Sequence, residues 1–384
     1  MPNQFLNAFS SIAVVLNRGL AYLDRAVHYA SGYILYYLFN GLKPQTHTRP
    51  CKTRHGRYYS PAVVVTGASE GIGFATALHL ANKGYTVFAT APSDTELSKI
   101  RQAAAEYSNG DGSTRGGGGE GRGRGALHPA IMDVLSPDSI THCAGHIESV
   151  LGGDPDRPLV GVVNNAGYCM ISPMELTPEA DARRVFELDF WAYISVIRAF
   201  LPVIKRNKGR FVNIGSYGGY VNPPLWAPYC ALKAAVEGMT RAWRLELLPF
   251  GVGMTTVRPG WTRTGGVGPG METAWAQYWD NLSKGAVGVD SFGRVIRSDG
   301  PVQEAEERVY RPMIDKWHKL TSAAMEGAAQ PAEAVASTVH DALTDRFLQP
   351  YYTVGYDALL GQMARDLTPE NIYEYFVAKT FGAL

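Results

Sequence analysis

The sequence predicts an α/β fold: a doubly wound parallel sheet of about seven strands, flanked by helices. Short apolar runs such as Ala62–Thr66 (AVVVT) are typical of strands buried on both faces of a parallel sheet. These runs alternate with helical patterns along the chain, as right-handed crossover connections require. The first run leads directly into the turn GASEGIG and then into the helical pattern FATALHLANKG.

The remaining elements follow in order. The predicted strands and helices after the first turn are Tyr85–Thr90, the helix Asp94–Tyr107, Ala130–Val134 ending around Asp133, the helix Ser136–Val150 capped by Ser136, Val160–Gly167, a long helix Val185–Arg206, Arg210–Ser216, a helix carrying Tyr229 and Lys233, Gly253–Arg258, the helix Pro331–Thr344 and Tyr351–Gly355. Residues 108–125 are so rich in glycine that we expect a disordered surface insertion there.

Composition excludes several classes of protein. The 384 residues are 46% hydrophobic and 18% charged, with a net charge of +1, so nothing indicates a nucleic-acid partner. The four cysteines (Cys51, Cys143, Cys169 and Cys230) show neither CxxC nor metal-ligand spacing. We therefore expect reduced thiols and no metal site.

Residues 1–57 differ from the rest, with one acid, Asp24, against seven lysines and arginines. Their apolar runs, FLNAFSSIAVVL and YILYYLF, are shorter than the roughly 20 residues of a spanning helix. No charged n-region or A-x-A site indicates a signal peptide. The pattern favours one or two membrane-surface or hairpin helices with a basic cytosolic flank. A further helix packed on the domain and a mitochondrial presequence are the alternatives.

The turn after the first strand has the composition of a dinucleotide-binding loop. Gly67, Gly71 and Gly73 let the backbone approach phosphates, and the helix that follows offers free N–H groups and a positive dipole. This order of strand, glycine turn and helix predicts that a pyrophosphate binds here.

A second motif, SYGGYVNPPLWAPYCALK, has the chemistry of a proton-transfer site. Tyr229 and Lys233 stand at i and i+4 and share a face if the segment is helical. A phenol has an ordinary pKa of about 10, which a neighbouring cation lowers toward the working range. Ser216 could donate a hydrogen bond to the same substrate oxygen. The motif predicts proton exchange with an alcohol.

Together these motifs resemble the short-chain dehydrogenases/reductases of the TGxxxGxG branch. The resemblance rests on Thr66-Gly67-x3-Gly71-x-Gly73, Asp133, Asn164-Asn165-Ala166-Gly167, Ser216, Tyr229, Lys233 and Pro259-Gly260, in the family's order, and covers about Pro61 to Thr264. It implies a Rossmann-type fold, a nicotinamide cofactor, and a homodimer in which the helices bearing Asp189 and Tyr229 pair.

The resemblance also implies roles for individual residues. Tyr229 would be the general acid/base, Lys233 would lower its pKa and hold the nicotinamide ribose, and Ser216 would orient the substrate oxygen. The cofactor would contact the set Thr66, Gly67, Ser69, Glu70, Gly71, Ile72, Gly73, Asp133 (at the adenine), Asn164, Ala166, Gly167, Tyr229, Lys233, Pro259, Gly260, Thr262 and Thr264 (at the carboxamide).

One position departs from the family. Where the family carries an Asn that holds a water relay to the Lys, this chain has Asp189 in ELDFWA. An isosteric exchange would leave the relay working. Alternatively, a carboxylate beside Lys233 would pair with it, shift both pKa values and slow turnover.

The usual signals for cofactor choice are absent at the end of the second strand. A carboxylate there selects NAD and an arginine accommodates NADP, but this chain has Ala91 and Pro92. Glu70, in the glycine loop, would repel a 2′-phosphate. Between NAD(H) and NADP(H), this charge favours NAD(H).

The chain after Thr264 is rich in Trp, Tyr and Met, as in METAWAQYWDNLSKG and PMIDKWHKL. In the family this region covers the substrate, and neighbouring segments look similar to retinol, 17β-hydroxysteroid and 3-hydroxybutyrate dehydrogenases. An apolar pocket suits a retinoid, steroid or other lipid alcohol, although ordinary core packing would also use these aromatics.

The sequence therefore predicts three parts: a membrane-associating segment and basic linker (1–57), a cofactor-binding catalytic core (58–265) and a substrate-binding extension (266–384). The expected function is NAD(P)-dependent interconversion of a hydrophobic alcohol and its carbonyl at a cytosolic membrane face, of the endoplasmic reticulum or a lipid droplet, with mitochondria as the alternative. The competing hypothesis is a dinucleotide-binding scaffold or regulator with little turnover because of Asp189.

Overall fold

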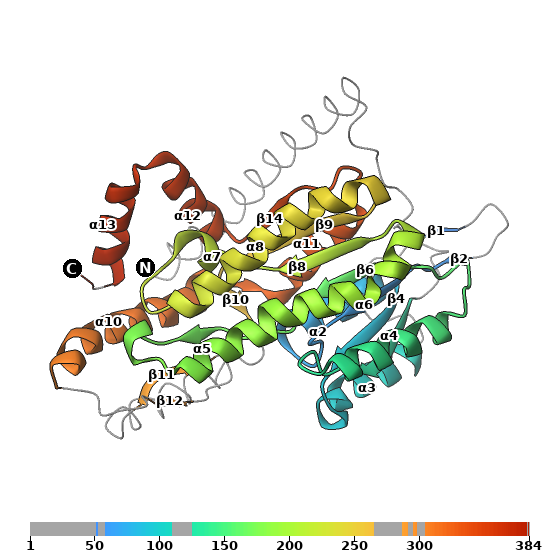
Figure 1. Cartoon of the computed structure of the whole chain (residues 1–384), viewed down its shortest axis with the longest axis horizontal. Helices are drawn as coiled ribbons and strands as arrows, with labels where there is room; N and C mark the ends of the chain where they lie inside the picture. The colour runs from blue at the N-terminus through green and yellow to red at the C-terminus, as the bar shows by residue number, and fades with distance from the viewer. Residues whose placement is uncertain are drawn as a thin grey trace, which may run out of the picture.

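The structure, a computed structural model, describes residues 51–52, 58–109, 125–264, 286–290, 295–297, 304–381 and 383. Its centre is a parallel sheet of seven strands in the order β14-β9-β8-β6-β3-β4-β5 (Figure 1). These strands are β3 (Ala62–Val65), β4 (Thr86–Ala91), β5 (Ala126–Ile131), β6 (Leu159–Asn164), β8 (Arg210–Ile214), β9 (Gly253–Pro259) and β14 (Tyr351–Val354). The predicted doubly wound sheet is confirmed.

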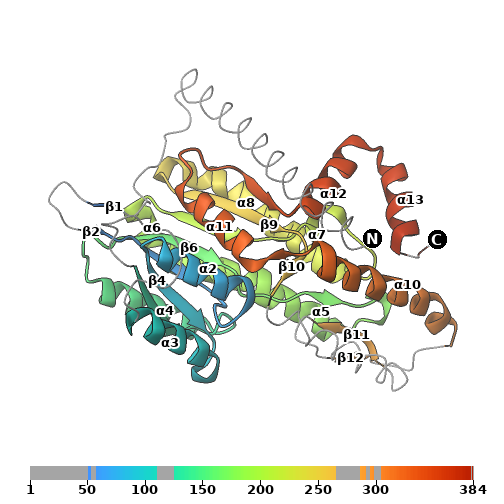
Figure 2. The same ribbon diagram turned by 180° about the vertical axis from the view of Figure 1, so that it is seen from behind.

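Helices cover both faces of the sheet. Figure 1 looks onto α6 and α8, and the reverse view in Figure 2 looks onto α2 and α11. The helices that pack on the sheet are α2 (Gly71–Asn82), α3 (Asp94–Asn109), α4 (Pro137–Leu151), α6 (Ala192–Asn207), α8 (Ala227–Leu247) and α11 (Ala332–Thr344).

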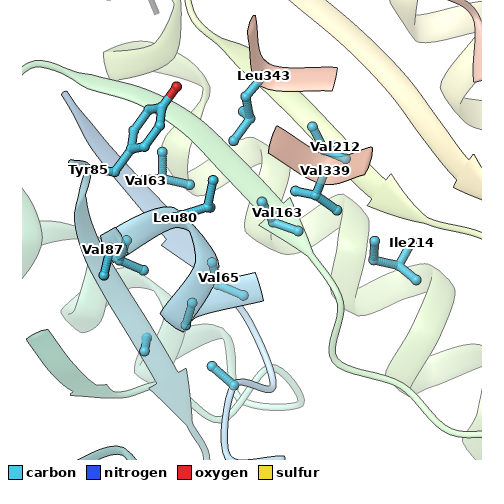
Figure 3. Packing of buried hydrophobic residues seen from close by; sticks show 14 of the residues in the cluster. Val63, Val65, Leu80, Tyr85, Val87, Val163, Val212, Ile214, Val339 and Leu343 are labelled. Carbon is cyan, nitrogen blue, oxygen red and sulfur yellow. The ribbon is translucent and has the colours of Figure 1, made fainter. Parts of the chain in front are cut away.

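Side chains along each strand point alternately to the two faces of the sheet, which explains why helices pack on both. Val63 and Val65 of β3 pack with α2, α3 and α11, as the close view in Figure 3 shows for part of that cluster. Their neighbours Ala62 and Val64 pack with α4 and α6 on the other face. Because a parallel sheet buries both faces, the strand AVVV is apolar at every position, and all four side chains are fully buried.

Two predicted elements differ in their bounds. The third strand begins at Ala126 and ends at Ile131, before Asp133. It is an edge strand paired only with β4, where Pro129 is tolerated although its nitrogen cannot donate to a ladder. The long helix begins at Glu179 as α5 (Glu179–Phe186) and passes through a π-helical turn, η2 (Glu187–Trp191), into α6.

Of the predicted extension, α11 and β14 belong to the sheet and its helical layer, and the other elements lie at the carboxyl end of the sheet. They include α10 (Glu304–Ala323), the π-helical turn η4 (Ala324–Ala328), α12 (Tyr356–Leu367) and α13 (Glu370–Phe381). The short elements are β1 (Cys51–Lys52), β2 (Tyr58–Tyr59), β7 (Met170–Ile171), η1 (Met174–Leu176), α7 (Gly218–Val221), η3 (Leu248–Phe250), β10 (Thr262–Arg263), β11 (Ala286–Asp290), β12 (Val295–Arg297) and β13 (Gln330–Pro331).

Three predictions fall outside the described residues: the membrane-associating helices within residues 1–50, most of the glycine-rich insertion, and the aromatic segment 271–285 that was expected to cover the substrate. Within the described part of the chain, no helix has the length and apolar character to cross a bilayer.

Candidate active site

A cavity of about 1130 Å³ opens at the carboxyl ends of the central strands. Its lining comes from the loops after β3, β4, β5, β6, β8 and β9, and from helices α8, α10 and α13. In a parallel doubly wound sheet this edge is where ligands bind, because helix N-termini and loop backbones converge there.

The glycine loop forms one wall of this cavity. A Cβ on Gly73 would overlap the Gly67 carbonyl oxygen, and one on Gly67 would come within 2.7 Å of the Ala166 Cα. Gly67 and Gly71 also have φ near +60°, which side chains disfavour. Glu70 precedes α2 without capping it through its side chain, so the first N–H groups of the helix remain for a ligand. This cradle fits a pyrophosphate.

Thr66 and Asn165 hold the glycine loop to the end of β6. The Thr66 Oγ1 accepts hydrogen bonds from the backbone N–H groups of Asn165 (2.9 Å) and Ala166 (3.0 Å). In return, the Asn165 Nδ2 donates to the carbonyl oxygens of Thr66 and Gly67, both at 3.0 Å. Asn165 therefore shapes the loop, a role that the motif alone did not indicate.

Asn164, expected to support the strand end on the cofactor side, lies behind the cavity wall. Its side chain is fully buried and its Nδ2 donates to the Asn213 Oδ1 at 2.8 Å, which links β6 to β8. Asn213 in turn donates to the Thr240 Oγ1 of α8. Asn164 thus supports the strand ends beneath the cavity.

The catalytic trio comes together as the motif predicts. Ser216 follows β8, while Tyr229 and Lys233 lie one turn apart on α8, and all three line the cavity. The Ser216 hydroxyl also accepts a hydrogen bond from the Gly218 N–H (3.0 Å), which fixes its position beside the phenol.

Tyr229 is partly buried and lines the cavity. Burial raises the pKa of Tyr229 well above its ordinary value, and the nearby Cys169 and Asp189 add to the rise, while a hydrogen bond with Ser216 opposes it. The Lys233 Nζ lies 5.6 Å from the centre of the Tyr229 ring. The lowering of the phenol pKa by Lys233 stays a prediction.

Lys233 is instead held by Asp189. The Lys233 Nζ lies 2.9 Å from the Asp189 Oδ2, and these side chains are only 5% and 0% exposed. The Nζ also donates to the Ile214 carbonyl oxygen at 3.1 Å. Burial raises the pKa of the Asp189 carboxyl, opposed by the Lys233 ammonium and by the Tyr168 N–H, which donates to the Asp189 Oδ1.

Local geometry makes room for this carboxylate. Asp189 lies in the π-helical turn η2, a backbone irregularity that is frequent at functional sites. A Cβ on Gly167 would overlap the carboxylate, so the glycine that ends the Asn-Asn-Ala-Gly motif is required by Asp189.

The segment after β9 forms the opposite wall. Pro259, Gly260, Thr262 and Thr264 all line the cavity, as predicted. A carboxylate from the extension supports them: the Asp357 Oδ2 of α12 accepts a hydrogen bond from the Trp261 N–H at 2.7 Å.

Aromatic side chains surround the far end of the cavity, next to Tyr229. Trp226 lies edge-on to both Tyr229 and Trp261, with ring centres 5.6 Å apart in each case, and Trp317 of α10 is 5.5 Å from Trp226. Helix α13 adds Tyr373, Val377 and Phe381 to the lining. This end can accept a bulky apolar molecule.

The predicted site residues therefore converge on one cavity. Those that line it are Gly67, Ser69, Glu70, Gly71, Ile72, Asp133, Ala166, Gly167, Asp189, Ser216, Tyr229, Lys233, Pro259, Gly260, Thr262 and Thr264. Thr66, Gly73 and Asn164 are not among the lining residues and support it from behind.

Comparison with known proteins agrees with this arrangement. The chain is 33% identical to the mitochondrial D-beta-hydroxybutyrate dehydrogenase of Bos taurus over 202 residues, which is 52% of this chain and 54% of that protein. It thus spans about half the length of that relative. The human 17-beta-hydroxysteroid dehydrogenase type 2 is 27% identical over 327 residues, 84% of this chain and 74% of that protein.

A short-chain dehydrogenase from Streptomyces avermitilis has the same fold, with a TM-score of 0.59, 23% identity, and coverage of 85% of this chain and 99% of that one. The short chain dehydrogenase family profile matches residues 61–273. Because this match takes in more than half of the chain, the protein belongs to the short-chain dehydrogenase family.

Proposed function

We propose that the protein is a nicotinamide-dependent oxidoreductase that interconverts an uncharged, apolar alcohol and its carbonyl. The observation that carries this proposal is the position of Tyr229, between a glycine-rich wall that fits a dinucleotide and an aromatic end. Gly67, Ser69, Gly71 and Ile72 would hold the pyrophosphate, Asp133 the adenine, and Thr264 the carboxamide.

In alcohol oxidation, a proton leaves the substrate oxygen and a hydride leaves the carbon. A nicotinamide dinucleotide held by these residues would supply the hydride acceptor for this step, and the hydride donor for the reverse one. Tyr229 would take the proton from the substrate hydroxyl, with Ser216 donating a hydrogen bond to the same oxygen. Lys233 would hold the nicotinamide ribose and supply positive charge near the phenol.

The charge of the cavity lining supports an uncharged substrate. The charged lining residues are Glu70, Glu96, Lys99, Asp133, Arg184 and the Asp189–Lys233 pair. The lining contributed by α7, α10, η4 and α13 has no charged side chain among the described residues. A hydroxy acid bound against these elements would need a cation for its carboxylate, because burying an unpaired charge is costly, and Arg184 of α5 is the lining cation to consider for that role.

This argument favours the substrate class of the steroid dehydrogenase relative, or a retinoid of similar size, over hydroxybutyrate. The test is absorbance at 340 nm with purified full-length protein, NAD(H) or NADP(H), and matched steroid, retinoid and short hydroxy-acid alcohols. We expect turnover with the apolar alcohols and at least about tenfold lower kcat/KM with the hydroxy acid, equivalent to about 1.4 kcal/mol. Preference for the hydroxy acid would contradict the proposal.

The Asp189–Lys233 pair favours a second candidate function, a dinucleotide-binding scaffold or regulator with little turnover. A carboxylate that neutralises Lys233 removes positive charge from the site, and Asp189 raises the pKa of Tyr229. Tight dinucleotide binding without any absorbance change across the whole panel would support this candidate.

We also propose that residues 1–57 bring the protein to a cytosolic membrane surface, where an apolar substrate is dissolved. The support is their basic, apolar sequence together with the uncharged end of the cavity. Deleting residues 1–57 should move the protein from the membrane pellet to the soluble fraction. A deletion of residues 110–124 is the matched control and should leave it in the pellet. Retention of the first variant in the pellet would refute the proposal.

A further inference from the structure

The end of β4 lacks the side chain that ordinarily distinguishes the two nicotinamide dinucleotides. Ala91 is buried, and Pro92 has neither a carboxylate nor a hydrogen-bond donor. The glycine loop lies directly against this strand end, because the Ala68 N–H donates to the Thr90 carbonyl oxygen at 2.8 Å. The ribose between the pyrophosphate and an adenine at Asp133 must therefore be recognised by a side chain from another element.

Helix α3 places a carboxylate at this position. The Glu96 side chain, on the first turn of α3, lines the cavity and its Oε2 lies 3.5 Å from the Ser69 Oγ of the glycine loop. The other acid of that turn, Asp94, is paired with Arg101 at 2.7 Å. Among the ion pairs of the described residues, none involves Glu96.

We infer that the Glu96 carboxylate binds the adenosine ribose, in place of the carboxylate that is missing at the end of β4, and that it thereby selects NAD(H). This inference rests on the proposed function, since it needs a dinucleotide in the cavity. A carboxylate accepts two hydrogen bonds from a ribose diol and repels a 2′-phosphate, and Glu70 adds a second negative charge to the same wall.

Lys99 is the competing group. It lies one turn after Glu96 on α3 and also lines the cavity, so it could pair with a 2′-phosphate. Two carboxylates against one ammonium leave this wall negative, which opposes a phosphate that carries close to two negative charges. The inference therefore assigns the selectivity to Glu96 and no comparable role to Lys99.

The test measures dissociation constants of NADH and NADPH by fluorescence, using full-length wild type, Glu96→Gln, Lys99→Gln and Glu106→Gln. Glu106 is the matched control, because it lies on the same helix, outside the cavity, next to Gln102. We expect the wild type to bind NADH more tightly. Glu96→Gln should weaken NADH about tenfold, the loss of one charge-assisted hydrogen bond, without weakening NADPH. Lys99→Gln removes positive charge from this wall and should keep or increase the preference for NADH, whereas Glu106→Gln should keep the wild-type ratio within about twofold.

The outcomes separate this inference from the proposed function. If neither dinucleotide binds the wild type, both are wrong. If both bind and Glu96→Gln leaves their ratio unchanged, or the wild type prefers NADPH and loses that preference in Lys99→Gln, the inference about Glu96 is wrong and the proposed function stands.

Discussion

Replacing Tyr229 with phenylalanine should lower kcat by about 10²- to 10⁴-fold, the usual contribution of a positioned acid or base. The hydroxyl is the only group lost, and the ring can keep its edge-on contact with Trp226. The dissociation constant of the dinucleotide should change by less than about threefold, because the glycine loop and Lys233 are untouched. Steady-state rates and fluorescence titration measure the two effects separately.

Tyr220→Phe is the control for this variant. Tyr220 follows Ser216 by four residues, but its hydroxyl donates to Asp366 of α12 and it does not line the cavity. Its loss should leave kcat within about twofold. An equal loss of kcat in Tyr229→Phe and Tyr220→Phe would mean that each hydroxyl acts through the stability of the fold. It would argue against Tyr229 as the acid/base.

Replacing Asp189 with asparagine should move the pH–rate profile of alcohol oxidation toward lower pH. Oxidation needs the Tyr229 phenolate, so the rate rises with pH as that group loses its proton. The Asp189 carboxylate raises the pKa of Tyr229, so removing its negative charge lowers that pKa. We expect the rising limb to shift toward acid and kcat at neutral pH to increase.

This variant also changes stability, because Lys233 loses a buried counterion. An asparagine keeps one acceptor oxygen, for the Tyr168 N–H or for Lys233 but not for both, so we expect a loss of about 3 kcal/mol rather than unfolding. Thermal denaturation checks that the variant is folded at assay temperature. A folded Asp189→Asn protein with an unchanged pH profile would show that the carboxylate does not tune Tyr229.

The sequence predicted the parts of the site that depend on local spacing. Tyr229 and Lys233 share a helix face through their i, i+4 spacing, and the glycine loop follows directly from β3. The motif alone could not assign different roles to two adjacent asparagines. Asn164 binds Asn213 of β8 behind the cavity, whereas Asn165 holds the glycine loop. Successive side chains along a strand point to opposite faces of the sheet. The residue at which β6 ends therefore decides which side chain reaches the cavity.

Contacts between distant segments were beyond reach of the sequence. Glu96 meets Ser69 only because the glycine loop crosses the end of β4, and Asp357 reaches Trp261 across 96 positions. The direct pairing of Asp189 with Lys233 belonged to one of two open alternatives. The distance of 2.9 Å shows the pairing, and its effect on turnover stays a prediction. The third strand was placed too late because Pro129 is unusual in strands, and only its position at the sheet edge explains it.

Deuteride transfer from a 4-deuterated reduced dinucleotide to an uncharged apolar ketone tests the central claim most directly. Wild-type protein should give an alcohol with one deuterium on the carbinol carbon, detected by mass spectrometry, and Tyr229→Phe should give about 10²- to 10⁴-fold less in the same time. Dinucleotide binding by the wild type with no deuterium in any steroid, retinoid or acyl alcohol would contradict the assignment of this cavity as an oxidoreductase active site.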